Sequence, residues 1–374
     1  MNRVRLLKGI DAVVGRAVAC VASRMPISTS QPGSIVSILL IRPGGIGDAV
    51  LLMPAIIALK QKFPQASITV LAERRNAATF ALCPEVDRVL HYDMPSELLS
   101  AIRGRYDLVI DSEQWHRLSA VVARLCRPKL LIGFATNERR RLFSHGVSYS
   151  HDDYEVTSFL RLLEPLGITG GKVEAPFLTV PAAAMEEADA LLAPLGGQPF
   201  VVIFPGASIP ERRWGAERYS RVAEALNDEG YPVVVVGGNG DREQGELIVA
   251  AGRGLNLAGR TSLAETAAVL ARSSLLVSGD SGVLHLAVGL GVRTVSLFGP
   301  GRALKWAPRG GGHVVLNRNL ACSPCTTFGT TPPCPSGARC MREITVEQVL
   351  HQINAFLTPA RHARSRRQGA KENK

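Results

Sequence analysis

The sequence predicts an α/β protein made of two doubly wound domains, each a parallel sheet with helices on both faces. Three observations predict it. Short apolar runs alternate with helical stretches, glycine-rich turns join them, and the whole pattern starts again near residue 200. Strands buried on both faces read as continuous apolar runs, and alternation with helices is typical of parallel sheets. The length of 374 residues suits two ordinary domains.

Four apolar runs are the expected strands of the first half. They cover residues 37–41, 67–71, 106–111 and 130–134. A glycine-rich turn over residues 42–48 separates the first run from a helix expected over 49–63. Parallel strands bind ligands at their carboxyl ends, so this turn is the first place to look for a site.

The second half repeats this arrangement after a connection around residues 172–198. A helix is expected over 216–229, directly after the first strand and its turn. The expected strands cover residues 200–204, 232–236, 275–278 and 294–298. Two such halves predict a ligand-binding cleft between them.

The first residues read as a basic amphipathic helix over 3–24, and two interpretations of it stay open. Asp11 and Arg16 interrupt the apolar centre that a signal peptide needs. The helix either lies on an anionic membrane surface or packs on the body of the protein. Its apolar residues recur at helical spacing: Leu6, Leu7, Ile10, Val13, Val14, Ala17, Val18 and Val21.

The net charge of +11 and the pI near 9.6 indicate an anionic partner. Nucleic acid, a phospholipid surface and a phosphorylated glycolipid all carry the right charge. Aromatic residues make up only 5% and no nucleic-acid-binding motif is present, which argues against nucleic acid. No apolar run reaches the length of a transmembrane helix.

The glycine turn of the first half is the sharpest local signal. Gly44, Gly45 and Gly47 let a ligand approach the backbone, and the following helix presents free amides to an anion. The spacing is neither that of the dinucleotide motif nor that of a P-loop. Asp48 is either the N-cap of this helix or a carboxylate base that accepts a proton from a sugar hydroxyl.

Two turns of the second half suit a phosphorylated ligand. Residues 205–208 are small and precede Arg212, a combination that fits a diphosphate or, more simply, a solvated loop. Ser281 opens a helix whose amides can face a phosphate, and Asp280 is expected to cap that helix or hold the turn. His285, one helical turn later, either faces the same ligand or is a core residue.

Taken together, these motifs resemble glycosyltransferase family 9, the lipopolysaccharide heptosyltransferase family. The resemblance covers roughly residues 36–350 and rests on residues 41–48 with Pro54 and Ala55, 106–111, 205–208 with 212–214, and 280–282 with 285–287. It implies a GT-B-like fold of two Rossmann-like domains that face each other across a cleft. The expected divisions are a helix and linker over 1–33, an acceptor-binding domain over 34–180, a nucleotide-sugar-binding domain over 181–358 and a basic disordered tail over 359–374.

The resemblance also implies an activity. The chain is expected to be an inverting, metal-independent glycosyltransferase that moves a heptose or related sugar from an ADP-sugar to a lipopolysaccharide-core or similar glycan acceptor, with no cofactor. It is expected in the cytoplasm, peripherally bound at the inner face of the cytoplasmic membrane, and without a nucleic-acid partner. The alternative is a non-catalytic nucleotide-sugar-binding protein of the same fold.

The resemblance assigns roles to individual residues. Asp48 becomes the general base. The donor contacts are Ser208, Arg212, Asp280, Ser281, Gly282, Val283 and His285. The segment after Asp111 departs from the family pattern, and its polar residues Glu113, His116 and Arg117 are interpreted as acceptor contacts.

Four cysteines gather near the end of the chain. Cys322 and Cys325 have the spacing of a zinc-binding pair, and Cys334 and Cys340 complete a set of four thiols. They are expected to form a structural element outside the catalytic site, either holding structural zinc or free.

Overall fold

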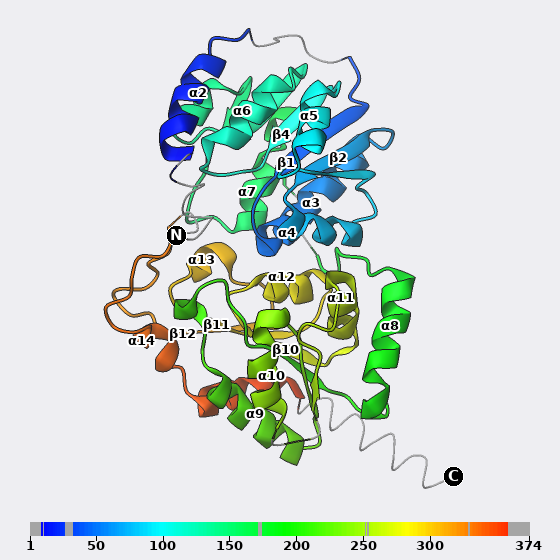
Figure 1. Cartoon of the computed structure of the whole chain (residues 1–374), viewed down its shortest axis with the longest axis vertical. Helices are drawn as coiled ribbons and strands as arrows, with labels where there is room; N and C mark the ends of the chain where they lie inside the picture. The colour runs from blue at the N-terminus through cyan, green and yellow to red at the C-terminus, as the bar shows by residue number, and fades with distance from the viewer. Residues whose placement is uncertain are drawn as a thin grey trace. The chain divides into compact units, whose positions relative to one another are not determined.

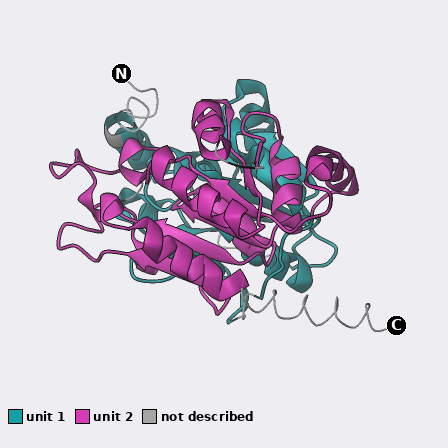
Figure 2. Cartoon of the chain, turned by 90° about the horizontal axis from the view of Figure 1, so that it is seen from below, with its two compact units in different colours: residues 1–179 teal, residues 180–374 magenta. Residues whose placement is uncertain are grey.

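The computed structural model describes residues 9, 11–26, 33–170, 174–250, 252, 254–327 and 330–357. The chain divides into two compact units, unit 1 (Met1–Thr179) and unit 2 (Val180–Lys374), which are coloured separately in Figure 2. The predicted tail over 359–374 lies outside the described residues, as does most of the linker predicted before residue 33.

Unit 1 is built on a six-stranded parallel sheet of order β3-β2-β1-β4-β5-β6. All four predicted strands are present. The structure also contains β3 and β6, which the sequence did not predict because they are short and have few apolar residues. The strands are β1 (Ser37–Arg42), β2 (Ser67–Ala72), β3 (Arg88–His91), β4 (Leu108–Asp111), β5 (Leu130–Phe134) and β6 (His145–Val147).

Alternate side chains of each central strand bury against helices on opposite faces of the sheet. Leu39 and Ile41 of β1 belong to one hydrophobic cluster with Ala101 of α5 and Ala120 of α6. Figure 1 shows the helices layered over the sheet. They are α2 (Arg16–Ala22), α3 (Ile46–Lys62), α4 (Arg74–Ala77), α5 (Pro95–Arg103), α6 (Arg117–Leu125) and α7 (Glu155–Arg161), with shorter turns η1 (Asp11–Gly15), η2 (Ala78–Leu82), η3 (Asn137–Arg141) and η4 (Glu164–Leu166).

Unit 2 repeats the architecture with a parallel sheet of order β12-β11-β10-β7-β8-β9. Its strands are β7 (Val201–Phe204), β8 (Val233–Val235), β9 (Leu255–Asn256), β10 (Leu275–Gly279), β11 (Thr294–Phe298) and β12 (His313–Asn317). The first strand of each unit lies beside the fourth, which is the strand order of a doubly wound Rossmann sheet. The predicted fold class is therefore confirmed.

The helices of unit 2 enclose a second hydrophobic core. It includes Trp214, Tyr219 and Ile353, the last from a final helical stretch over residues 346–357. The named helices are α8 (Ala182–Leu192), α9 (Ala216–Asp228), α10 (Arg242–Val249), α11 (Leu263–Arg272), α12 (Gly282–Gly289), α13 (Ala303–Trp306) and α14 (Arg339–Arg342), with turns η5 (Ala193–Leu195), η6 (Pro210–Arg212) and η7 (Asn239–Asp241).

The N-terminal helix, η1 continued by α2, packs on α6 of unit 1. It uses its small residues to do so: Gly15, Ala19 and Ala22 are buried, and a Cβ added at Gly15 would lie 3.3 Å from Cβ of Arg117. Val13 and Val21 point away and remain 74% and 64% exposed. Of the two open interpretations, packing on the body is found, but the described valines of the helix face outward. Residues 3–8 and 10 of the predicted helix lie outside the described residues.

The carboxylate of Asp11 attaches this helix to unit 1 by accepting hydrogen bonds at the N-terminus of α6. Its Oδ1 accepts hydrogen bonds from the backbone amides of Arg117 (2.8 Å) and Leu118 (2.9 Å), which are free donors at a helix start. Burial raises the pKa of Asp11, but hydrogen bonds from His116 and these two amides outweigh it and hold the pKa below its ordinary value of 3.8. The carboxylate is therefore stabilised in the folded chain.

Replacing Asp11 with Ala is expected to lower the free energy of unfolding of unit 1 by about 1–2 kcal/mol and to expose α2 to hydrogen exchange. The contribution of a carboxylate with a lowered pKa is complete above its unfolded pKa and disappears as the pH falls through its folded pKa. The stability difference between the variant and the wild type in urea unfolding should therefore begin to shrink below about pH 4 and vanish below the folded pKa of Asp11. The control is Asp189→Ala, which removes an exposed ion pair with Arg272 and should change little.

Candidate functional site

The glycine turn joins β1 to α3 beside the boundary between β1 and β4, where the strand order of unit 1 reverses. Ligands of doubly wound sheets bind at this reversal. Gly44 has φ of 123°, and a Cβ there would lie 3.1 Å from Nη2 of Arg42, so the turn needs glycine at this position. A Cβ at Gly45 would meet nothing within 4 Å, so the backbone there is open to a ligand.

Asp48 lies half-buried in the first turn of α3. The N-cap of α3 is Gly45, so the interpretation of Asp48 as the N-cap is wrong. A carboxylate in the first turn interacts favourably with the helix dipole. The side chain therefore lies at the edge of the sheet where doubly wound folds bind ligands, without a capping role.

The side chain of a buried arginine, Arg42, packs against the glycine turn. Arg42 is 1% exposed, and its guanidinium donates to Glu113 Oε2 (2.9 Å) and to the carbonyls of Ser112 and Pro43 (2.8 Å each). Burial lowers the pKa of Arg42, but the carboxylates of Glu113, Asp48 and other neighbours more than offset it and raise the pKa. This pair ties the end of β1 to the loop after β4, close to the charge of Asp48.

More buried polar side chains lie near the Arg42–Glu113 pair. Asp111 and Arg139 form an ion pair of 3.0 Å with both side chains fully buried. Glu155 of α7 accepts hydrogen bonds from Gln114 (2.6 Å) and from the Tyr149 hydroxyl (3.1 Å). Burial raises the pKa of Tyr149, and the charges of Glu155 and Asp48 raise it further, so the hydroxyl stays protonated. Fixed polar groups of this kind pre-organise a site.

The three predicted acceptor contacts lie in the loop after β4 and at the start of α6, and two of them, Glu113 and Arg117, are buried and ion-paired. Glu113 is paired with Arg42, and Arg117 with Glu138 at 2.7 Å. Burial raises the pKa of Glu113, but Arg42 above all lowers it below its ordinary value. His116 is about one-third exposed, with its Nδ1 3.5 Å from Asp11. These side chains have structural roles, and their contact with an acceptor stays a prediction.

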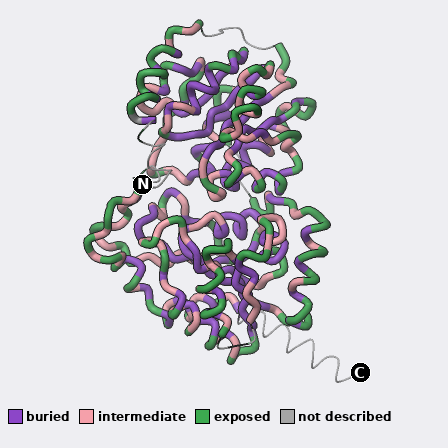
Figure 3. The backbone as a smooth tube through the Cα atoms, viewed as in Figure 1, coloured by how far each residue is buried: buried purple, intermediate pink, exposed green. Residues whose placement is uncertain are grey.

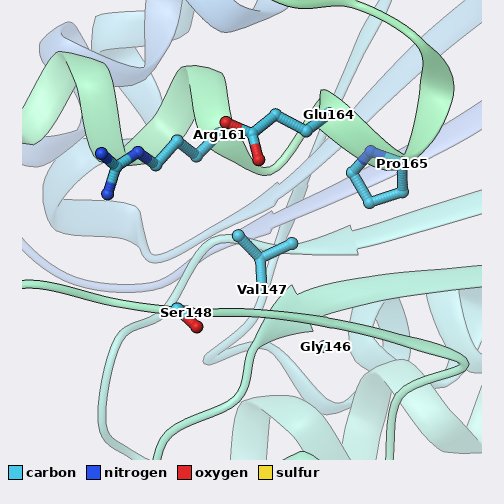
Figure 4. A pocket seen from close by; sticks show the side chains of 6 residues that line it. All are labelled: Gly146, Val147, Ser148, Arg161, Glu164 and Pro165. Atoms are coloured by element: carbon cyan, nitrogen blue, oxygen red, sulfur yellow. The ribbon is translucent and has the colours of Figure 1, made fainter.

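Two surface pockets of unit 1 contain none of the predicted site residues. One, of about 470 Å³, lies beside β6 and is shown in Figure 4; it is lined by Gly146, Val147, Ser148, Arg161, Glu164 and Pro165. The other, of about 310 Å³, is lined by Ala135, Asn137, Glu138, Arg140 and Arg141. We therefore place the candidate site of unit 1 at the strand reversal and not at either of these pockets.

In unit 2 the predicted donor residues gather at the corresponding reversal, where β7 lies beside β10. Residues 205–208 follow β7, with Ser208 exposed, and Arg212 ends the short turn η6. Arg212 Nη1 lies 3.1 Å from Oδ2 of Asp280, which follows β10. Two motifs far apart in the sequence are thus joined by one ion pair.

The turn after β10 starts α12. Ser281 is the N-cap, and its Oγ accepts from the amide of Leu284 (3.2 Å) while it also bonds Ser278 Oγ (2.9 Å). Asp280 therefore does not cap the helix; it holds Arg212. Val283 and His285 are buried in α12, so the core interpretation of His285 fits its position.

The sequence patterns missed one part of this site, the loop after β11. A Cβ at Gly301 would lie 2.0 Å from Oδ2 of Asp280, so only glycine leaves room for the carboxylate. No motif pointed to this contact, because glycine after a strand is common in turns. In unit 1 the sequence patterns also missed Tyr149 and Glu155. These residues lie far along the chain from the glycine turn, so no local pattern connects them with it.

The cysteine segment packs against that same loop. The amide of Cys325 donates to the carbonyl of Pro300 (3.1 Å), and Cys340 is buried beside Gly299. All four thiols are free. Within the part of the chain that the structure describes, no group of three or more His, Cys, Asp or Glu side chains is arranged to hold a metal ion. Structural zinc at these cysteines is therefore not supported by their arrangement.

Comparisons with known proteins agree with one another. The sequence profile of glycosyltransferase family 9 (heptosyltransferase) matches residues 96–333. Lipopolysaccharide heptosyltransferase 3 of Escherichia coli is 27% identical over 289 residues, which span 70% of this chain and 83% of that protein.

Solved structures share the fold. A glycosyl transferase of family 9 from Veillonella parvula superimposes with a TM-score of 0.73 at 20% identity, over 87% of this chain and 98% of its own. The ADP-heptose lps heptosyltransferase II of E. coli gives a TM-score of 0.70 at 24% identity, over 87% and 100%. At these identities the structural likeness concerns the fold alone.

Proposed function

Since the chain belongs to glycosyltransferase family 9, the heptosyltransferase family, we propose that it transfers a heptose or a related sugar from an ADP-sugar to a lipopolysaccharide-core or similar glycan acceptor. That the chain is a glycosyltransferase follows from the family. The donor and acceptor are proposed from the names of its relatives, which include an ADP-heptose transferase and lipopolysaccharide heptosyltransferases. The observation that carries the proposal is the carboxylate of Asp48 beside an open glycine turn, since a protein that only binds donor needs no base there.

In the proposed reaction unit 1 activates the acceptor. Asp48 takes the proton from an acceptor hydroxyl while that oxygen forms a bond to the anomeric carbon of the donor sugar. The bond from this carbon to the diphosphate breaks on the opposite face, so the configuration inverts and ADP leaves with the bonding electrons. Arg42, fixed by Glu113, keeps the turn that carries Asp48 in place.

Unit 2 binds the donor in this proposal. Ser208, Arg212 and the amides at the start of α12 are the groups for the diphosphate, with Ser281, Gly282 and Val283 along the rest of the nucleotide-sugar. His285, buried in α12, supports these residues from the core. Arg212 bridges Asp280 and the arriving phosphates, so the like charges of carboxylate and diphosphate do not meet directly. The leaving diphosphate gains negative charge, which a fixed arginine and helix amides stabilise without a metal ion.

Turnover of ADP-heptose tests the proposal. Purified chain is offered ADP-heptose and lipopolysaccharide-core oligosaccharide, ADP release is followed, and the anomeric configuration of the product is read by NMR. We expect an inverted product, a rate unchanged by EDTA, and no comparable turnover of UDP- or GDP-sugars. Rescue by Mg²⁺ of an EDTA-inactivated enzyme would contradict the metal-independent step. Tight ADP-sugar binding without turnover on any core acceptor would favour the alternative, a nucleotide-sugar-binding protein.

We also place the enzyme at the inner face of the cytoplasmic membrane, where a membrane-anchored acceptor is available. The net charge of +11 supports this position, because anionic lipid attracts it. Among the residues described in the structure, no helix is both long and apolar enough to span a membrane.

A further inference from the structure

The N-terminal helix presents a patch of large apolar side chains to solvent. Val13, Val14, Val18 and Val21, here called the valine face, are 74%, 48%, 37% and 64% exposed. They are four of the ten exposed large hydrophobic residues of the described chain, and all lie within a few turns of one helix. Single exposed hydrophobics are common on proteins, whereas a contiguous patch marks an interaction surface.

The orientation of the helix is the reverse of that in an ordinary surface helix. Such helices bury their large apolar residues and expose the small and polar ones. Here Gly15, Ala19 and Ala22 lie against the body, and the carboxylate of Asp11 is buried at α6 with two backbone amides. Val13 and Val21 point away from this face, as their exposures show. The fold therefore holds the helix by its small residues and leaves the valine face free for a partner.

Arginines border the valine face. The turn η3 packs beside α2, where Arg16 Nε lies 3.0 Å from Glu138 Oε1. Arg140 and Arg141 are the last two residues of η3 and are exposed, as is Arg24 just beyond α2. Figure 3 shows exposed backbone along the N-terminal helix, which is labelled α2 in Figure 1. Further along the sequence toward the N-terminus come Arg3, Arg5 and Lys8. An apolar face bordered by cations matches a surface of anionic lipid, with acyl chains beneath phosphate headgroups.

We propose that the valine face inserts into the headgroup layer of an anionic membrane, while Arg24, Arg140 and Arg141 contact lipid phosphates. Unit 1 then rests on the membrane through this helix, parallel to the surface, and the buried Asp11 keeps the helix attached to the unit. The inference rests on the proposed function in one respect, that an enzyme with a membrane-anchored acceptor has a use for such a surface.

Vesicle binding by the full chain tests the valine face. Vesicles of phosphatidylethanolamine and phosphatidylglycerol are sedimented with the wild type and with Val13→Gln/Val21→Gln, in which glutamine keeps the helix propensity. We expect the partition coefficient to fall by roughly tenfold or more in the double variant. Val36→Gln is the matched control, because Val36 is 53% exposed in unit 1 but lies outside the helix. It should bind as the wild type does.

The cationic border is tested in the same assay. Arg140→Gln/Arg141→Gln should weaken binding about fivefold for each arginine removed, and added salt or vesicles of phosphatidylcholine alone should weaken binding of the wild type. Equal vesicle binding by the valine double variant and the wild type would overturn the proposal. So would loss of a dimer in sedimentation velocity with vesicle binding unchanged, since the valine face would then be a protein interface.

A soluble acceptor separates this inference from the proposed function. On a lipid-free core oligosaccharide, the valine and arginine variants should turn over ADP-sugar at the rate of the wild type. If neither the wild type nor any variant turns over ADP-sugar while vesicle binding still depends on the valines, the proposed function is wrong. The inference that the valine face binds lipid is then still supported.

Discussion

Asp48→Asn is expected to lower kcat for sugar transfer by about 10²- to 10⁴-fold, the usual contribution of a general base, while the affinity for ADP-sugar stays unchanged. Asparagine has nearly the shape of aspartate but accepts no proton in this pH range. The N-cap of α3 is Gly45, so the substitution removes no capping bond and the turn should survive. Single-turnover kinetics measure the chemical step, and calorimetric titration with ADP-sugar measures donor binding.

The matched control is Asp93→Asn. Asp93 is an acidic residue of unit 1 just after β3, near the carboxyl ends of the strands, and it pairs with Arg74 away from the strand reversal. Its variant should turn over as the wild type does. If Asp48→Asn retained the wild-type rate, another group would be the base; if it lost donor affinity as steeply as rate, Asp48 would belong to donor binding instead.

Most of the sheet topology could be predicted because buried parallel strands leave a strong mark on a sequence. The runs that became β1, β7 and β10 are continuously apolar, and each was expected within one or two residues of its observed ends. Two of the missed strands lack such a run: β3 reads Arg-Val-Leu-His, and β9 has only two residues. Another missed strand, β12, reads His-Val-Val-Leu-Asn and has only three consecutive apolar residues. These strands depend on pairing with a neighbour that is already in place, which no local pattern records.

The resemblance to family 9 assigned Arg212 and Asp280 to one donor-binding site. In the structure they form an ion pair, a contact that the sequence analysis did not predict. The resemblance itself is confirmed. The hydrogen bonds around Arg42 were not predictable, since Glu155 joins them through Gln114 from a helix far along the chain. The periodicity of the N-terminus predicted a helix, yet periodicity alone does not say which face packs; the small residues there decided it.

The second large effect is expected at Arg212. Arg212→Ala should lower kcat by about 10²- to 10³-fold, because the leaving diphosphate loses the fixed cation that stabilises its growing charge. Donor affinity should fall as well, since the same charge binds the ground-state diphosphate. Arg212→Lys should retain much of both, because the charge remains although the paired donors of the guanidinium are lost. ADP release in single turnovers and titration with ADP-sugar give the two quantities.

A stability effect has to be separated from this catalytic one. Arg212 Nη1 lies 3.1 Å from Asp280, whose side chain is only 8% exposed, so Arg212→Ala also leaves a buried carboxylate without its partner. Loss of one partner of such a pair costs about 3 kcal/mol or more. In Arg212→Ala/Asp280→Ala no unpaired charge remains, so stability should largely recover while the rate stays low. If the double variant recovered its rate together with its stability, Arg212 would act on the fold of the turn and the leaving diphosphate would be stabilised by other groups, with the amides of α12 first among them.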